Sequence, residues 1–233
     1  MNYFYLEDPV NSPYLDKEES HHCVKVLRKR SGDKIEIMDG KGALYTCEIV
    51  DDNFRKCGFT ILDKKASDRI NPSKIHIAIA PTKNHDRIEW FVEKAAEMGL
   101  DDISLILSKR TERKKINMER LERKTVSALK QSRNLFKTSI KGCFSFEDFV
   151  AQSKDYQQKF IAFVDSSNPD YLHKVAEPGK DTLILIGPEG DFTDDEVALA
   201  RSHDFHKVSL GKSVLRTETA GVVACHTMTL IND

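Results

Sequence analysis

Two loops in the C-terminal third of the chain carry residues that could bind a small ligand. The first, residues 187–192, follows an apolar stretch and precedes residues 193–196, a capping-box pattern that predicts the start of a helix. Gly187 and Gly190 allow the backbone to approach a ligand closely, and the first turn of the helix offers free N–H groups. Three acidic side chains in or just after this loop, Glu189, Asp191 and Asp194, disfavour a phosphate and suit a neutral or cationic ligand. A plain strand-to-helix turn would show the same pattern.

The second loop, residues 209–216, also leaves a strand pattern through a glycine, Gly211, and enters a helix pattern. Arg216 and Glu218 stand at the start of that helix. In a parallel sheet both loops would follow the carboxyl ends of strands and converge on the crevice where such sheets bind ligands. An ion pair at the helix start is the alternative explanation for Arg216 and Glu218.

The elements that would position these loops alternate between strand and helix after residue 73. Short apolar runs predict strands at 75–80, 103–107, 160–164, 183–186 and 207–210. Apolar residues at helical spacing predict helices at 88–95, 118–129, after 193 and at 217–231. This alternation predicts an α/β fold with a mostly parallel sheet. The last helix is apolar or small nearly all round, which indicates burial in the domain or in a subunit interface.

The first 70 residues predict a different, smaller domain. Strand patterns at 3–6, 34–38, 43–50 and 57–62, with one helix at 16–27, favour a small β-barrel or sandwich. The polar, proline-containing stretch at 67–73 is the best candidate for a boundary. We therefore expect one domain at 1–70 and a second at 71–233.

Composition excludes several classes of protein. The chain of 233 residues is 39% hydrophobic and 31% charged, which is typical of a folded globular protein. No apolar run approaches the ~18 residues of a membrane span, and the start lacks the basic segment of a signal peptide, so we expect a cytoplasmic protein. The five cysteines are scattered without a Cys-x-x-Cys pair, which argues against a disulfide scaffold or a metal site. The patterns of P-loop and serine hydrolases are also missing.

One basic block stands out in a chain whose formal net charge is −1. Residues 109–141 contain twelve lysines and arginines against three acids, a net charge of +9. Such a block is typical of a surface that binds a polyanion such as RNA, although a well-solvated helix would show it too.

The two loops together resemble those of the RsmE family. These proteins belong to the SPOUT superfamily and methylate N3 of a uridine in the 16S RNA of the small ribosomal subunit. The resemblance rests on residues 186–190 (IGPEG) and 210–220 (LGKSVLRTETA), and it extends to 21–28, 83–99 and 130–133. It spans nearly the whole chain in order. One departure is Asp191, which stands where the family usually has a second glycine.

The resemblance implies a PUA-like RNA-binding barrel followed by a SPOUT domain with a C-terminal trefoil knot. It also implies a homodimer without metal or membrane, 16S rRNA as partner and S-adenosylmethionine (SAM) as cofactor. The positions that it assigns to the cofactor pocket are Leu185, Gly187, Glu189, Gly190, Leu210, Gly211, Val214, Leu215 and Arg216.

The chemistry of this reaction suggests roles for the remaining residues. Arg216 could stabilise the uracil anion that forms when N3 loses its proton, and Glu218 could orient Arg216 or assist the departure of the proton. We expect phosphate contacts from two basic groups, namely Lys25, Arg28, Lys29 and Arg30, and Arg110, Arg113, Lys114 and Arg133. The alternatives are a non-catalytic rRNA-binding or assembly factor of the same fold, and a SPOUT methyltransferase for another RNA.

Overall fold

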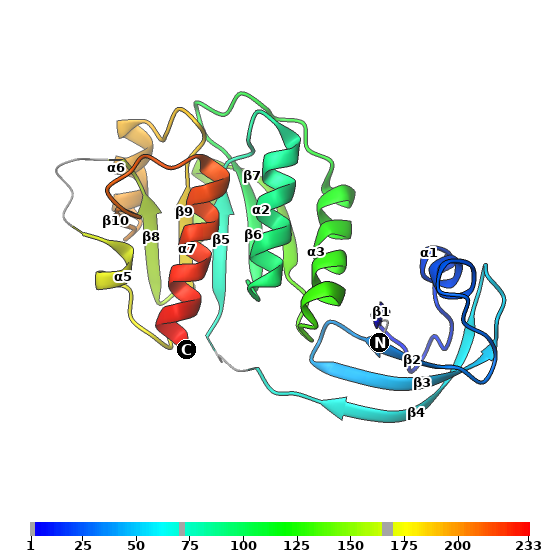
Figure 1. Ribbon diagram of the computed structural model, residues 1–233. Helices are drawn as coiled ribbons and strands as arrows, with labels where there is room; N and C mark the ends of the chain where they lie inside the picture. The colour runs from blue at the N-terminus through cyan, green and yellow to red at the C-terminus, as the bar shows by residue number, and fades with distance from the viewer. Residues whose placement is uncertain (1–2, 70–72, 165–169) are drawn as a thin grey trace. The chain divides into compact units, whose positions relative to one another are not determined.

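The structure is a computed structural model that describes residues 3–69, 73–164 and 170–233 (Figure 1). The chain divides into two compact units. The first consists of Met1–Ile70 together with Val126–Lys137, and the second of Asn71–Thr125 together with Thr138–Asp233. Residues 70–72, which belong to the expected boundary stretch, lie outside the described residues.

The described residues contain ten strands and eight helical segments. The strands are β1 (Tyr3–Tyr5), β2 (Lys34–Met38), β3 (Ala43–Asp51), β4 (Gly58–Ala66), β5 (Ile75–Ile79), β6 (Asp102–Leu107), β7 (Ser139–Ser145), β8 (Gln158–Ala162), β9 (Thr182–Ile186) and β10 (His206–Val208). The helices are α1 (Lys17–His21), the π-helix η1 (His22–Val26), α2 (His85–Glu97), α3 (Met118–Ser132), α4 (Phe146–Gln152), α5 (Leu172–Val175), α6 (Asp194–Ser202) and α7 (Thr217–Asn232).

The first unit contains a four-stranded sheet in the order β1-β2-β3-β4. β1 runs parallel to β2, and the other neighbours are antiparallel. The Asp39 carboxylate accepts hydrogen bonds from the N–H groups of Lys41 and Ala43, which closes the predicted hairpin between β2 and β3. The segment after α3 adds backbone pairs to this hairpin: Gly42 N–H donates to the carbonyl of Leu135, and Lys137 N–H to that of Gly40.

The second unit is built on a six-stranded sheet in the order β10-β8-β9-β5-β6-β7, with every neighbouring pair parallel. This confirms the predicted α/β fold with a parallel sheet. Both faces are covered, since Ile77 and Ile79 of β5 pack with α2 and α7 while Ala78 packs with α4 and α6. α2 and α7 lie side by side on one face (Figure 1).

Three elements of the second unit, β7, α4 and the four-residue helix α5, have no counterpart in the predicted pattern. β7 is an edge strand of mostly polar and half-buried residues, with Gly142 at φ 133°, so it lacks the apolar run that marks the inner strands. α4 follows it directly and has only seven residues, too few for a helical period to stand out. In the described part of the chain, none of the helices has the length and apolar character needed to cross a bilayer.

Helix α7 packs closely onto the sheet at one small residue. A Cβ atom on Gly221 would lie 2.6 Å from Cε2 of Phe91 in α2 and 3.0 Å from Cδ1 of Ile79 in β5. Only a glycine allows this approach without displacing a buried ring. The start of α7, which holds Arg216 as N-cap residue, is thereby placed at the carboxyl edge of the sheet.

Candidate functional site

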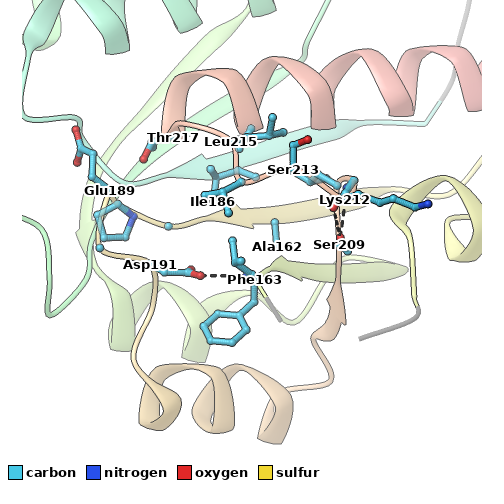
Figure 2. A pocket seen from close by; sticks show the side chains of 18 of the residues that line it. Ala162, Phe163, Ile186, Glu189, Asp191, Ser209, Lys212, Ser213, Leu215 and Thr217 are labelled. Atoms are coloured by element: carbon cyan, nitrogen blue, oxygen red, sulfur yellow. Dashed lines mark hydrogen bonds between the residues drawn. The ribbon is translucent and has the colours of Figure 1, made fainter. Parts of the chain in front are cut away.

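A pocket of about 620 Å³ lies at the carboxyl ends of β8, β9 and β10 (Figure 2). Three segments line it: 162–164 after β8, 186–191 after β9 and 209–215 after β10, with Tyr171, Thr217 and Ala220 completing the wall. The structure therefore brings together the two loops that the sequence singled out. The volume falls within the range of ordinary small-molecule sites.

Seven of the nine residues expected at the cofactor line this pocket: Gly187, Glu189, Gly190, Leu210, Gly211, Val214 and Leu215. Leu185 does not, because its side chain is buried in the core between the sheet and helices α4 and α6. Arg216 is also absent from the lining, and its side chain is exposed. Binding by any of these residues remains a prediction.

The loop after β9 is held by its own acidic side chain. Asp191 has a left-handed backbone, with φ at 60°, and its Oδ1 accepts a hydrogen bond from the N–H of Phe192. Its Oδ2 accepts one from the N–H of Val164, 3.0 Å away, so the side chain crosses to the segment after β8 (Figure 2). Burial raises the pKa of the Asp191 carboxyl, and the two N–H donors oppose that rise by stabilising the carboxylate.

Two further contacts shape the rim of the pocket. Glu189 Oε1 accepts a hydrogen bond from the backbone N–H of Lys83, 3.0 Å away. In the other loop, Ser209 Oγ donates to the carbonyl of Gly211 and accepts from its N–H. Lys212, the third charged residue of the lining, projects away from Glu189 and Asp191 (Figure 2), so among the lining residues these two acids are the charged groups on their side of the pocket.

The start of α7 carries unpaired polar atoms. The Oγ1 of Thr217, which lines the pocket, and the Oε2 of Glu218 are both buried without a hydrogen-bond partner among the described residues. The other carboxylate oxygen of Glu218 lies 3.8 Å from Nε of Arg87 in α2. The ion pair that Glu218 makes among the described residues is thus with Arg87 and not with Arg216.

The sequence patterns predicted no role for Arg87, which lies within the matched motif at 83–99. Its contact with Glu218 joins α2 to α7, and the two residues are 131 positions apart. Local spacing contains no signal for such a pair.

The residues expected to bind RNA lie in both units. Lys25 lies over the ring of Phe54, 4.8 Å from its centroid, and Arg133 over that of Tyr3 at 5.7 Å. Both side chains are exposed, as are those of Arg28 and Lys114. The others make hydrogen bonds within the chain: Lys29 to the carbonyl of Lys34, Arg30 to that of Val24, Arg113 to that of Lys83, and Arg110 to those of Gly190 and Phe192.

This grouping differs from the expected one. Arg133 belongs to the first unit, with the basic residues of η1 and the turn after it, while Arg110, Arg113 and Lys114 belong to the second. Among the described residues, no group of three or more histidine, cysteine, aspartate or glutamate side chains could hold a metal ion.

Comparison with known proteins agrees with this geometry. The chain is 27% identical to the ribosomal RNA small subunit methyltransferase E of Bacillus subtilis over 219 residues, covering 89% of this chain and 85% of that protein. The crystal structure of a probable rRNA-methyltransferase from Porphyromonas gingivalis is 37% identical, with a TM-score of 0.93, covering 100% of this chain and 98% of that one. A Legionella pneumophila protein in complex with the bound cofactor SAM is 25% identical, with a TM-score of 0.89 and the same coverage.

Family models match both parts of the chain. One described as an RNA methyltransferase PUA domain matches residues 15–62, and one described as an RNA methyltransferase domain matches residues 69–229. These matches and the named relatives confirm the resemblance predicted from the motifs. With its parallel sheet, its pocket at the strand ends and its N-terminal PUA domain, the chain belongs to the RNA methyltransferase family.

Proposed function

We propose that this protein transfers a methyl group from SAM to N3 of a uridine in 16S rRNA of the small ribosomal subunit. The relatives support the cofactor and the RNA, since one is named for small-subunit rRNA and another holds SAM. The observation that carries the proposal is the pocket, which two glycine-containing loops form at the carboxyl ends of β9 and β10, the parallel strands on either side of β8.

The residues of the pocket fit SAM. The unpaired, buried hydroxyl of Thr217 is suited to a polar group of a ligand, and Asp191 and Glu189 suit a sulfonium cation. Apolar walls from Ile186 and Leu210 can pack against an adenine ring. When bound, SAM supplies the electrophilic methyl carbon. The cofactor contacts that we assign are Gly187, Glu189, Gly190, Leu210, Gly211, Val214 and Leu215.

Uracil N3 must lose its proton before it can accept the methyl group, and residues at the start of α7 can assist this ionisation. If uracil N3 titrates about two units above neutrality, its ionisation at pH 7 costs roughly 2.7 kcal/mol. The exposed guanidinium of Arg216 stands between Leu215 and Thr217, both of which line the pocket, so it can reach a base at the pocket mouth. There it stabilises the anionic uracil oxygens. Glu218 is paired with Arg87, and its free oxygen can accept a hydrogen bond from a bound group.

The remaining features follow from the same proposal. Exposed basic residues of the PUA domain, Lys25, Arg28 and Arg133, contact RNA phosphates. The mostly apolar α7 contributes to a homodimer interface, and Leu230 on it is 61% exposed. We place the activity in the cytoplasm, where ribosomal subunits are made. A closed PUA-like barrel and a trefoil knot in the C-terminal part belong to this proposal as well.

The decisive experiment is methyl transfer from labelled SAM to unmethylated small ribosomal subunits, followed by nucleoside mass spectrometry. We expect N3-methyluridine at a single site. Label at another position would refute the N3 assignment, and label on tRNA alone would refute the choice of RNA. Binding of both ligands without transfer would point to a non-catalytic assembly factor.

The role of Arg216 has its own test. We expect Arg216→Ala to lower turnover at least tenfold while SAM affinity stays within twofold, because the guanidinium lies outside the pocket lining. Arg201→Ala, which removes an exposed arginine of α6, is the matched control and should leave turnover unchanged. A fall of less than tenfold in Arg216→Ala, with SAM affinity kept, would refute the assignment.

A further inference from the structure

We propose that Arg110 is a positioning residue for the cofactor loop and not an RNA contact. It lies in the basic connector that follows β6, residues 108–117, whose charge led us to expect phosphate binding. This inference rests on the proposed function, because it takes residues 187–192 as the loop that binds SAM.

The guanidinium of Arg110 is directed at the backbone of that loop. Its Nη1 donates a hydrogen bond of 2.6 Å to the carbonyl of Gly190 and lies 3.3 Å from the carbonyl of Phe192. Both carbonyls therefore share one charged donor, on either side of the left-handed residue Asp191. A charged donor gives stronger hydrogen bonds than a neutral one.

The stem of Arg110 supports the same loop. A Cβ atom on Gly190 would lie 3.3 Å from Cδ of Arg110 and 3.5 Å from its Cβ, so the arginine packs along the bare face of this glycine. The charge also acts on Asp191, because Arg110 favours the carboxylate and lowers its pKa against the effect of burial. That carboxylate accepts the hydrogen bond from the N–H of Val164, in the segment after β8.

The backbone of the connector is itself held by hydrogen bonds, which fix the position from which Arg110 extends. Ser108 N–H donates to the hydroxyl of Thr111, and Lys109 N–H donates to Oε1 of Glu196 at 2.7 Å. Glu196 also completes the capping box with Thr193 at the start of α6. The connector thus contacts α6 directly after the loop that Arg110 holds.

A second chain of contacts connects the connector to Glu189 of the same loop. Nη1 of Arg113 donates to the carbonyl of Lys83, and the N–H of Lys83 donates to the Glu189 side chain. Lys114, by contrast, is exposed and makes no hydrogen bond or ion pair among the residues that the structure describes. The charge of this connector therefore divides into side chains that hold the site and side chains that face solvent.

The test compares Arg110→Ala and Arg110→Lys with Lys114→Ala as matched control. Calorimetry without RNA should show SAM affinity about tenfold weaker in Arg110→Ala, the loss expected for one charge-assisted hydrogen bond. Arg110→Lys, which keeps a stem and a charged donor, should recover part of it. In turnover, Arg110→Ala should raise KM for SAM more than it lowers kcat. Lys114→Ala should leave SAM affinity unchanged.

The salt dependence of binding to a 16S rRNA fragment separates the two roles. Arg110→Ala should keep the wild-type slope of log affinity against log salt, whereas loss of one phosphate contact lowers that slope by about one. A lowered slope with unchanged SAM affinity would overturn the proposal.

Hydrogen exchange without any ligand tests the contact directly. Amides of residues 190–193 should exchange faster in Arg110→Ala than in Lys114→Ala, at equal melting temperature. If the wild-type protein bound no SAM, the proposed function would fail, and this exchange measurement would still decide whether Arg110 holds the loop. Equal exchange in both variants would overturn the inference.

Discussion

Replacing Gly221 with alanine tests the packing that holds α7 against the sheet. In a helix interior, alanine is favoured over glycine by about 1 kcal/mol, so Gly221→Ala should stabilise the protein if space allowed. The added Cβ, however, would lie 2.6 Å from Cε2 and 2.7 Å from Cδ2 of Phe91, and 3.0 Å from Cδ1 of Ile79. Ordinary carbon contacts are about 3.5–4.0 Å.

The short contacts of the added Cβ determine whether Gly221→Ala stabilises or destabilises the protein. Phe91 and Ile79 are both fully buried, so neither side chain can swing into solvent. Overpacking of this kind costs typically about 1–3 kcal/mol, and three short contacts place this site at the upper end. After the gain in helix propensity, we expect a net loss of about 1–2 kcal/mol. For a protein of this size, that loss lowers the melting temperature by about 2–8 °C.

The single tryptophan provides the assay. Trp90 precedes Phe91 in α2, so its fluorescence during urea denaturation reports on the unit that contains the clash. A double-mutant cycle with Phe91→Leu supplies the control, because the smaller side chain makes room for the new Cβ. The two substitutions should show a favourable coupling of at least about 1 kcal/mol. A Gly221→Ala protein as stable as the wild type, or an additive cycle, would refute the reasoning.

Two further predictions concern titratable side chains. Burial lowers the pKa of His76 to about 4, so between pH 6.5 and 4 the unfolded chain binds a proton that the folded chain does not, and the free energy of unfolding falls by up to about 3 kcal/mol as the pH is lowered. The urea midpoints at pH 7 and pH 4.5 should therefore differ less in His76→Gln than in the wild type. Equal differences in the two proteins would contradict this prediction. Asp191→Asn keeps one acceptor for two N–H groups, so leaving one unpaired should cost about 1–3 kcal/mol and weaken SAM binding. A thermal melt and calorimetry check this prediction, and unchanged values in both would contradict it.

Local patterns predicted the elements with strong periodicity and the two loops between them. The apolar runs of β5 and β9, and the capping box of Thr193 and Glu196, contain their information within a few residues, and the structure has all three. Such local patterns could not predict the order of the strands in the sheet. β9 pairs with β5 across more than a hundred residues, and nothing in either run specifies its neighbour.

The same limit applied to the charged side chains of the site. The sequence shows that residues 109–141 are basic but not which guanidinium binds the backbone of another loop, because the acceptors of Arg110 are carbonyls 80 and 82 positions away. Likewise, the partner of Glu218 proved to be Arg87 and not its neighbour Arg216. Pairs of this kind are determined by tertiary structure.

The backbone pairs between the β2–β3 hairpin and residues 135–137 have a consequence for synthesis on the ribosome. The N–H of Gly42 and the carbonyl of Gly40 find their partners only when Leu135 and Lys137 have been made, more than ninety residues later. At translation rates of about 5–20 residues per second, the nascent N-terminal sheet waits roughly 5–20 s with these groups unpaired. A fragment ending near residue 70 would stay in that state permanently. The N-terminal unit can therefore be completed only after residue 137 has been made, when more than fifty residues of the second unit have already left the ribosome's catalytic centre.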